Sequence, residues 1–311
     1  MSGAEPNAAE MGLGRIARPS GAFAMVATDQ RESLRTIYQE ATGALVGDEV
    51  LRAFKVSAAR ILTPHASAIL VDRDYGLEPI LAAGALDASC GLIVAADALV
   101  QETGGPVTDS ALDTRVFAEA VRAQGAVALK LLVIWRDDDH RERRHRLAGS
   151  FIDMCRGAGL LSVVEVIVRA PVGRDAGWDR ETDALEAARE IGALRPDLYK
   201  AEMPYLGQTE PARMEEGSRA LTEAAPGPGW SSQPACRWSA SSLPSKLPVG
   251  VARPGSWRGE PSGRTPSRST GWRQTFSASR RRASRAWASS WMKWHALGGT
   301  LPADRTGASR L

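Results

Sequence analysis

The chain of 311 residues, 43% of them hydrophobic, is long enough for one large α/β domain or two ordinary ones and too long for a peptide-sized module. Its three cysteines show no CxxC spacing, which argues against a disulfide framework and against a zinc site. The N-terminus has no basic start followed by an apolar run, and no stretch of about 18 apolar residues occurs. We therefore expect a cytoplasmic protein that is neither secreted nor bound across a membrane.

Charge is divided unevenly along the chain. The formal net charge is +3, but residues 226–311 hold fourteen of the 39 Lys and Arg and only two of the 36 Asp and Glu. Seven of the nine tryptophans fall in the same segment. These differences predict a folded domain over residues 15–225 and a tail of different character over residues 226–311.

Short apolar runs recur through the predicted domain. They are rich in Val, Ile, Leu and Ala, as parallel strands covered on both faces are, and they are FAMVATD (23–29), SAILVD (67–72), CGLIVAAD (90–97), AVALKLLVIW (126–135), SVVEVIVR (162–169) and LYKAEMP (198–204). Amphipathic segments typical of helices lie between them, over 48–62, 110–125, 142–159 and 179–194. Six βα units in a row predict an α/β fold, namely a (β/α)₈ TIM barrel that needs two more units. A doubly wound open sheet is the alternative, but no GxGxxG follows any strand.

Charged residues recur near the carboxyl ends of these strands, where a barrel collects its chemistry: Asp29, Asp72, Asp97, Arg169 and Glu202. Residues two apart in a strand lie on the same face of the sheet. Lys130 and Glu165 therefore each share a face with apolar residues of their own strand. Burying such charged side chains costs free energy unless each is paired with an opposite charge or serves in binding or catalysis. Structural readings remain open, since a single strand-end charge such as Asp97 is often a helix cap or a solvated loop residue. Lys130 and Glu165 could likewise form one buried ion pair.

Lys200 stands inside an apolar strand, two residues before Glu202. A low-dielectric environment disfavours the ammonium form of a lysine, which leaves a neutral amine that can attack a carbonyl group and form a Schiff base. The sequence therefore predicts a nucleophilic lysine at position 200.

Five segments of the chain resemble class I aldolases of the tagatose-1,6-bisphosphate aldolase family, most closely the sulfofructosephosphate aldolase branch. They are GAFAMVATDQRESLR, FKVSAARILTPHASAILVDRDYG, ALKLLVIWR, VVEVIVRAP and DLYKAEMPYLG, which occur in the family's order within residues 15–225. The resemblance implies a TIM barrel without a metal or other cofactor, homo-oligomeric in the intact family. It also implies cleavage of a phosphorylated ketose to glycerone phosphate and an aldehyde by a Schiff-base lysine.

The resemblance assigns roles to individual residues. It places Lys200 on the Schiff-base lysine, with Glu165, or as second choice Asp29, taking the C4 hydroxyl proton and Lys130 lowering the pKa of Lys200 by like-charge repulsion. We expect substrate contacts from Gln30, Arg31, Lys55, Asp72, Arg169 and Glu202. Expected substrates are 6-deoxy-6-sulfofructose 1-phosphate, or tagatose or fructose 1,6-bisphosphate.

The two missing barrel units should follow Leu221, but the sequence there is rich in Ser, Pro, Arg and Gly and reads as disordered. Single-stranded nucleic-acid binding by this basic tail is one explanation, although no RRM, KH or zinc-knuckle pattern accompanies it. A shifted reading frame is another. With permitted codons, residues 229–238 and 254–264 read from the third nucleotide give VVISAGVPL and GLLAGRAVWA, which resemble the seventh and eighth strands of these aldolases. On this hypothesis the 311-residue chain is an inactive fragment and the frame-corrected chain is an active aldolase.

Overall fold

The computed structural model describes residues 12–101, 106–173 and 176–225. The expected seventh and eighth strands, the expected disorder and the shifted frame all concern residues 226–311, which lie outside the described residues. The described residues belong to one compact unit, to which the description below refers, except for Ile37–Ala44, which contain the last residues of helix α2.

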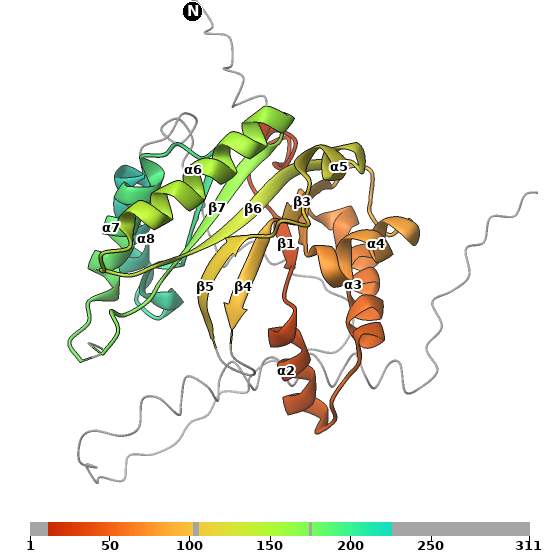
Figure 1. Cartoon of the computed structure of the whole chain (residues 1–311), viewed down its shortest axis with the longest axis horizontal. Coiled ribbons are helices and arrows are strands. Elements are labelled where there is room, and N and C mark those ends of the chain that lie inside the picture. The colour runs from red at the N-terminus through yellow and green to blue at the C-terminus, as the bar shows by residue number, and fades with distance from the viewer. Residues whose placement is uncertain (1–11, 102–105, 174–175, 226–311) are drawn as a thin grey trace, which may run out of the picture. The chain divides into compact units, whose positions relative to one another are not determined.

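A parallel sheet forms the frame of this unit (Figure 1). Its strands lie in the order β1-β2-β3-β6-β7-β8, and each neighbouring pair is parallel. Their bounds are β1 Met25–Thr28, β2 Ala68–Val71, β3 Gly91–Ala95, β6 Ala126–Trp135, β7 Leu161–Val168 and β8 Leu198–Ala201. All six apolar runs are therefore strands, as predicted. Their sequential order confirms the α/β, barrel-type fold class and lacks, among the described strands, the reversal that a doubly wound sheet requires.

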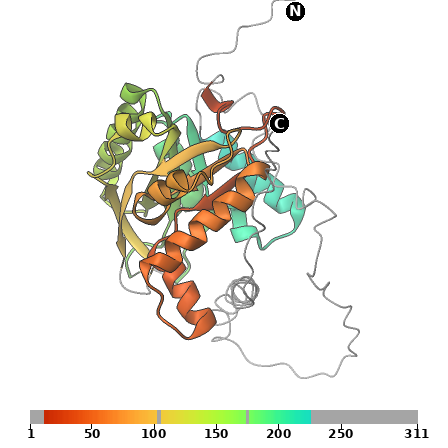
Figure 2. The same ribbon diagram turned by 90° about the vertical axis from the view of Figure 1, so that its right-hand side faces the viewer.

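Helices connect the strands, and those that follow residue 47 pack on one face of the sheet (Figures 1 and 2). Three of them match predicted segments, and the ends of these helices follow local chemistry: the Asp179 carboxylate accepts hydrogen bonds from the backbone N–H groups of Glu181 and Thr182, and Gly159 ends a helix with φ 65°. The bounds are α2 Glu32–Thr42, α3 Asp48–Leu62, α4 Glu78–Ala82, α5 Ala118–Ala123, α6 Arg141–Ala158, α7 Arg180–Gly192 and α8 Pro211–Ala224, with short helical turns η1 Thr63–His65, η2 Arg73–Leu77 and η3 Pro204–Gly207.

An antiparallel hairpin was missed by the sequence analysis. Its strands are β4 (Asp97–Gln101) and β5 (Val107–Leu112), so the segment 110–125, expected to be helical throughout, is helical only over α5. The Ser110 hydroxyl is buried and donates to the backbone oxygen of Leu132, and the Asp113 carboxylate accepts from the backbone N–H of Arg115. The Asp113 bond is local and competes with helical hydrogen bonds, while residues 107–112 pair with β4 instead, which explains why the helix begins late.

The two faces of the sheet bury different side chains. One apolar cluster packs strand residues such as Ile69 and Val94 against the helices, and a second joins the alternate residues of the strands with Ile16. The second, inner cluster contains Ala128, Val163 and Leu198. Two residues after each of these come Lys130, Glu165 and Lys200, so the three charges lie on the inner face, as the period-two argument predicts.

The sheet is strongly curled. Two strands separate β1 from β6, and in a flat sheet these two strands would be about 14 Å apart. Yet the Lys130 Nζ of β6 lies 3.0 Å from an oxygen of Asp29, the residue that follows β1. This curl brings the carboxyl ends of distant strands together.

A glycine at the start of β3 permits a close backbone approach. A Cβ atom added to Gly91 would lie 2.3 Å from the backbone oxygen of Arg15, whereas one added to Gly149, inside α6, would meet nothing within 4 Å. We expect Gly91→Ala to lower the free energy of unfolding by roughly 1–3 kcal/mol, because the backbone must move. Gly149→Ala should raise it by about 0.5–1 kcal/mol. Urea unfolding of both variants checks this, and unchanged stability of Gly91→Ala would contradict it.

Candidate active site

Lys130, in the middle of β6, occupies the centre of a cluster of charges that lies level with the carboxyl ends of the shorter strands β1, β3 and β8. Its Nζ lies 3.0 Å from Asp29 Oδ2, 3.1 Å from Asp97 Oδ2 and 2.9 Å from Glu165 Oε2. Its side chain is only 4% exposed. The expected Lys130–Glu165 ion pair is thus present, but as one of three contacts made by the same ammonium group.

The charges in this cluster keep one another ionised. Burial alone would lower the pKa of Lys130, but the carboxylates of Asp29, Asp97 and Glu165 outweigh it and raise the pKa above its ordinary value. Burial alone would likewise raise the pKa of Glu165, but the ammonium groups of Lys130 and Lys200 lower it. Lys130 is therefore a fixed cation and Glu165 a carboxylate at neutral pH.

Lys200 lies beside Glu165 in the sheet register, and its Nζ is 2.5 Å from Glu165 Oε1. Its side chain is 45% exposed. This differs from the low-dielectric surroundings expected from the sequence, because β8 has a described neighbour, β7, on one side only. Glu165 therefore bridges a buried lysine and an exposed one.

Asp97 is a member of this cluster for which the sequence left open a helix cap or a solvated loop residue. It is 1% exposed, and its Oδ2 accepts hydrogen bonds from Lys130 Nζ and the backbone N–H of Leu132, both at 3.1 Å. It is neither a helix cap nor a solvated loop residue. In the sequence, the one signal of a functional role for Asp97 was its position at the end of a buried apolar run. Its partners could not be identified there, because they come from β6 and from the loop after β1.

The loop after β1 contributes three predicted residues. Asp29 contacts Lys130, Gln30 accepts a hydrogen bond at its backbone oxygen from Lys55 Nζ at 2.7 Å, and Arg31 Nη2 donates to the backbone oxygen of Asp97 at 3.0 Å. Arg31 Nη2 also lies 3.3 Å from Asp97 Oδ1. The loop thus faces the Lys130 cluster.

Lys55 and Asp72 form a buried ion pair beneath this loop. Both side chains are 0% exposed. Lys55 Nζ also donates to the backbone oxygens of Thr28 and Gln30, at 2.6 and 2.7 Å, and Asp72 Oδ2 accepts from the backbone N–H of Tyr75. Burial lowers the pKa of Lys55 against the opposing effect of Asp72. Their burial differs from the expected substrate contact, because neither side chain can be reached by a solute.

Arg169 and Glu202 lie farther along the strands than Glu165 and Lys200. Glu202 Oε2 accepts from the backbone N–H of Val168 at 3.0 Å and is 3.2 Å from Arg180 Nη2, and Arg169 Nη1 is 4.0 Å from Glu202 Oε1. Arg169 follows Glu165 by four residues, or about 13 Å of strand. These residues form a second charged group near the site.

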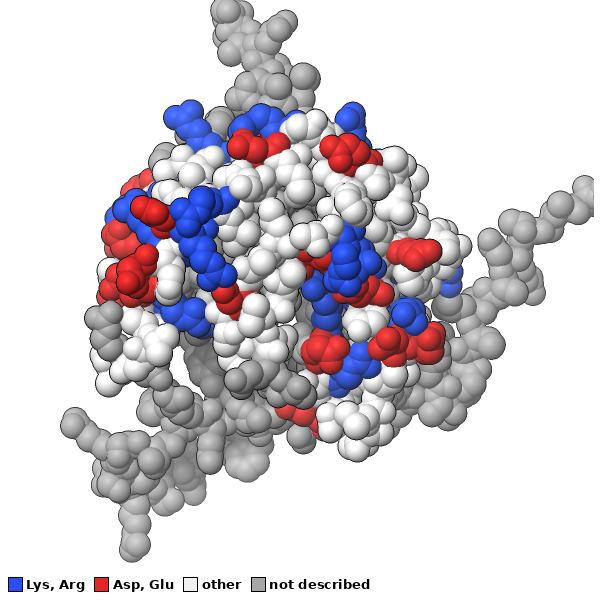
Figure 3. Space-filling model, viewed as in Figure 1, with Lys and Arg blue, Asp and Glu red and all other residues white. Residues whose placement is uncertain are grey.

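The described residues contain no group of three or more His, Cys, Asp or Glu side chains that could hold a metal ion. No helix among them is long and apolar enough to cross a bilayer. Cys90 and Cys155 are buried and free, while Cys236 lies outside the described residues. On the face shown in Figure 3, positive and negative side chains of the described residues are interspersed.

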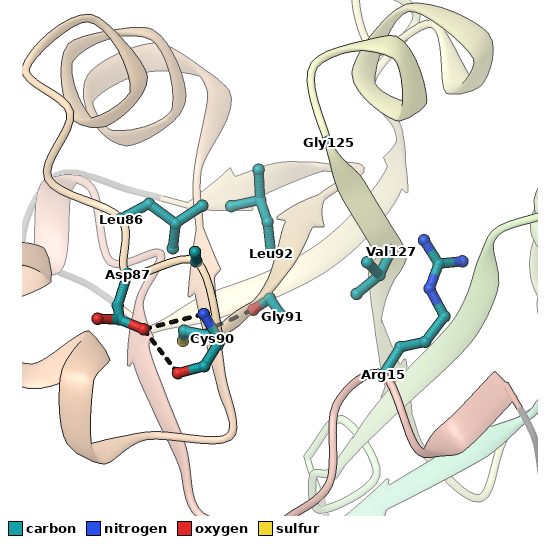
Figure 4. A pocket seen from close by; sticks show the side chains of 10 residues that line it. Arg15, Leu86, Asp87, Cys90, Gly91, Leu92, Gly125 and Val127 are labelled. Atoms are coloured by element: carbon teal, nitrogen blue, oxygen red, sulfur yellow. Dashed lines mark hydrogen bonds between the residues drawn. The ribbon is translucent and has the colours of Figure 1, made fainter.

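A cavity of about 250 Å³ lies at the opposite, amino-terminal ends of β3 and β6 (Figure 4). Arg15, Asp87, Cys90, Gly91 and Val127 are among its lining residues. It contains none of the predicted site residues. The charge cluster, and not this cavity, is the candidate active site, because a barrel places its chemistry at the carboxyl ends of its strands.

Comparisons with known proteins give the chain its family. Residues 23–241 match the family model described as DeoC/LacD family aldolase. The chain is similar to a protein named tagatose 1,6-diphosphate aldolase from Listeria monocytogenes serotype 4a, with 30% identity over 190 residues, 61% of this chain and 53% of the relative. It is 32% identical over 206 residues to tagatose 1,6-diphosphate aldolase 2 of Streptococcus agalactiae serotype III, covering 61% of this chain and 60% of the relative.

Among solved structures, a fructose-bisphosphate aldolase from Slackia heliotrinireducens matches with a TM-score of 0.46 and 20% identity, over 65% of this chain and 62% of that chain. An archaeal fructose 1,6-bisphosphate aldolase matches with a TM-score of 0.44 and 15% identity, over 69% and 86%. The chain spans about half the length of the curated Listeria relative, 53%. Because the family model covers well over half of its residues, the chain belongs to the DeoC/LacD family of aldolases.

Proposed function

We propose that this protein is a class I aldolase that cleaves a phosphorylated ketose through a Schiff base on Lys200. One observation carries the proposal. At the carboxyl ends of adjacent strands, the exposed amine of Lys200 contacts Glu165, whose other oxygen is held by the buried ammonium of Lys130. Three groups thus lie in one row, namely a nucleophile, a carboxylate able to exchange its proton and a fixed cation. Family membership supports the same chemistry.

The reaction begins when Glu165 takes a proton from Lys200. The neutral amine attacks the C2 carbonyl of the ketose, and loss of water leaves a protonated imine. Glu165 gives its proton to the hydroxyl group that departs as water, and the restored carboxylate then takes the proton of the C4 hydroxyl group as the C3–C4 bond breaks. The bonding electrons pass into the iminium to form an enamine, and the aldehyde leaves. Protonation of the enamine and hydrolysis release glycerone phosphate and restore Lys200.

Lys130 remains charged throughout. Its raised pKa makes it unsuited to nucleophilic attack and suited to holding Glu165 as a carboxylate. Both lysines contact Glu165, so the Lys130 charge lies next to the proposed nucleophile. Asp29, which is 15% exposed, is the second choice for the proton acceptor.

The other predicted residues fall into two roles. Gln30 and Arg31 contact hydroxyl or anionic groups of the substrate from the loop after β1, and Arg169 and Glu202 do so from the ends of β7 and β8. Lys55 and Asp72 position that first loop from beneath, since Lys55 holds the backbone oxygens of Thr28 and Gln30.

The substrate is tested by comparing tagatose 1,6-bisphosphate, fructose 1,6-bisphosphate and 6-deoxy-6-sulfofructose 1-phosphate. Release of glycerone phosphate from at least one is the expected result, and release from none contradicts the proposal. The names of the sequence relatives support a bisphosphate, whereas the sequence segments described above resemble the sulfosugar branch. Much higher kcat/KM for a bisphosphate would reject sulfofructose phosphate as the natural substrate. We further propose a cytoplasmic homo-oligomer without a membrane or nucleic-acid partner.

Chelation provides a prediction about cofactors. Imine formation withdraws electrons through the protonated nitrogen and needs no Lewis acid. We therefore expect the rate of glycerone phosphate release to be unchanged after incubation with EDTA. Loss of activity that an added divalent metal restores would instead indicate a metal-dependent aldolase.

A further inference from the structure

Asp97 has no part in the steps described above, yet it is the most buried carboxylate of the Lys130 cluster. It is 1% exposed, compared with 15% for Asp29 and 19% for Glu165. Asp97 is the first residue of β4, two residues after the end of β3, and its backbone oxygen accepts from Arg31 Nη2 at 3.0 Å.

The two carboxylate oxygens of Asp97 serve different cations. Oδ2 accepts from Lys130 Nζ and from the backbone N–H of Leu132, both at 3.1 Å, and Oδ1 lies 3.3 Å from Arg31 Nη2. The Nε of Arg31 is buried without a hydrogen-bond partner among the described residues. The described hydrogen bonds that fix the Arg31 guanidinium are therefore those to Asp97.

We propose that Asp97 is a positioning residue of the aldolase site: its carboxylate holds Lys130 against Glu165 with one oxygen and Arg31 over the site with the other. This inference rests on the proposed function. Its physical reason is the change of charge during the reaction. When Glu165 takes a proton it ceases to balance Lys130, and Asp29 can be reached by the substrate. Asp97 is the carboxylate that stays buried beside Lys130, so it keeps the Lys130 ammonium in place.

The test uses the full chain, which contains only five lysines: Lys55, Lys130, Lys200, Lys246 and Lys293. Acetic anhydride labels neutral amines, and peptide mass spectrometry at pH 8–10 gives the labelling rate of each lysine. Asp97→Asn preserves the side-chain shape but removes the charge about 3 Å from Lys130, so we expect Lys130 labelling to rise roughly tenfold or more relative to Lys246 and Lys293. In active protein the alkaline limb of the kcat/KM profile should shift to lower pH by about one unit.

Asp113→Asn is the matched control. Asp113 is also buried near the carboxyl ends of the strands, but it pairs with Arg73 and Arg115. It should leave Lys130 labelling unchanged. Asp97→Glu retains the charge, so it should keep labelling within about threefold of the original chain. This second variant decides the matter if Asp97→Asn does not fold.

Several results would overturn the inference. The first is a Lys130 labelling rate that Asp97→Asn does not change, or that rises equally in Asp113→Asn. The second is a Lys130 labelling rate that rises in Asp97→Glu as it does in Asp97→Asn. The third is an equal labelling rate for all five lysines in the original chain. Labelling is measured without substrate. A failure of imine formation at Lys200 would therefore reject the proposed function by a separate experiment, while the labelling still decides whether Asp97 holds Lys130.

Discussion

Lys130→Met should lower the free energy of unfolding by about 3–5 kcal/mol, because it leaves Asp29, Asp97 and Glu165 clustered without their shared cation. This is a large fraction of the total free energy of unfolding of a domain of ordinary stability. Urea unfolding at neutral pH measures it. Equal stability of the variant and the original chain would contradict the description of Lys130 as the centre of the cluster.

The same variant should show a characteristic pH dependence. In the original chain, the lowered pKa of Glu165 contributes stability that is present above pH 4.5, its ordinary value, and is lost as the pH falls through the lowered value. The raised pKa of Lys130 contributes stability below its ordinary value of 10.5, lost only as the pH rises through the raised value. Lys130→Met removes the Lys130 contribution and the part of the Glu165 contribution that Lys130 provides, while Lys200 keeps the rest. The deficit in the free energy of unfolding should therefore be largest near neutrality and shrink below pH 4.5, where Glu165 becomes protonated.

Lys200→Met is the matched control for stability. Lys200 contacts the same carboxylate, but its side chain is 45% exposed, and Glu165 keeps its contact with Lys130 after the substitution. Exposed ion pairs contribute little, so we expect a change of at most about 1 kcal/mol. A loss as large as that of Lys130→Met would show that the burial of the two lysines does not distinguish them.

Glu165→Gln should reduce glycerone phosphate release by about 10²–10⁴-fold, because the amide cannot take the C4 hydroxyl proton. Imine formation should slow but persist, since Lys200 remains while the carboxylate that takes its proton is lost. Steady-state turnover and borohydride trapping separate the two steps. Glu202→Gln removes a carboxylate from the neighbouring strand that contacts Arg180 and Val168 instead, and we expect it to cost less than about tenfold. Equal losses in both variants would contradict the role assigned to Glu165.

The sequence predicts the sheet well because buried parallel strands have a local signature. All six strands were identifiable from apolar runs, and the period of two placed Lys130 and Glu165 each on a face with residues two positions along its own strand; the structure brings them and Lys200 to one face of the sheet. The register then sets Glu165 beside Lys200. The hairpin β4–β5 was not identifiable, because the segment 110–125 carries a helix-like pattern, whereas β5 is set by its pairing with β4 and by the contact of Ser110 with Leu132, 22 residues away.

The site was less predictable, because its contacts join segments far apart in the chain. The pairing of Asp97 with Lys130 and Arg31 depends on the curl of the sheet, which no short segment reveals. Burial of Lys55 depends on Asp72 and on two backbone oxygens of another segment. The exposure of Lys200 follows from its place on β8, at the end of the described strand order.

Borohydride reduction in the presence of a ketose phosphate tests the central claim most directly. Peptide mass spectrometry locates the covalent adduct in the frame-corrected chain and in the 311-residue chain. We predict an adduct on Lys200 in the frame-corrected chain, a weaker one in the 311-residue chain, and none in Lys200→Ala. An adduct on Lys130, or no adduct on Lys200 in a folded frame-corrected chain, would contradict the assignment of Lys200 as the Schiff-base lysine.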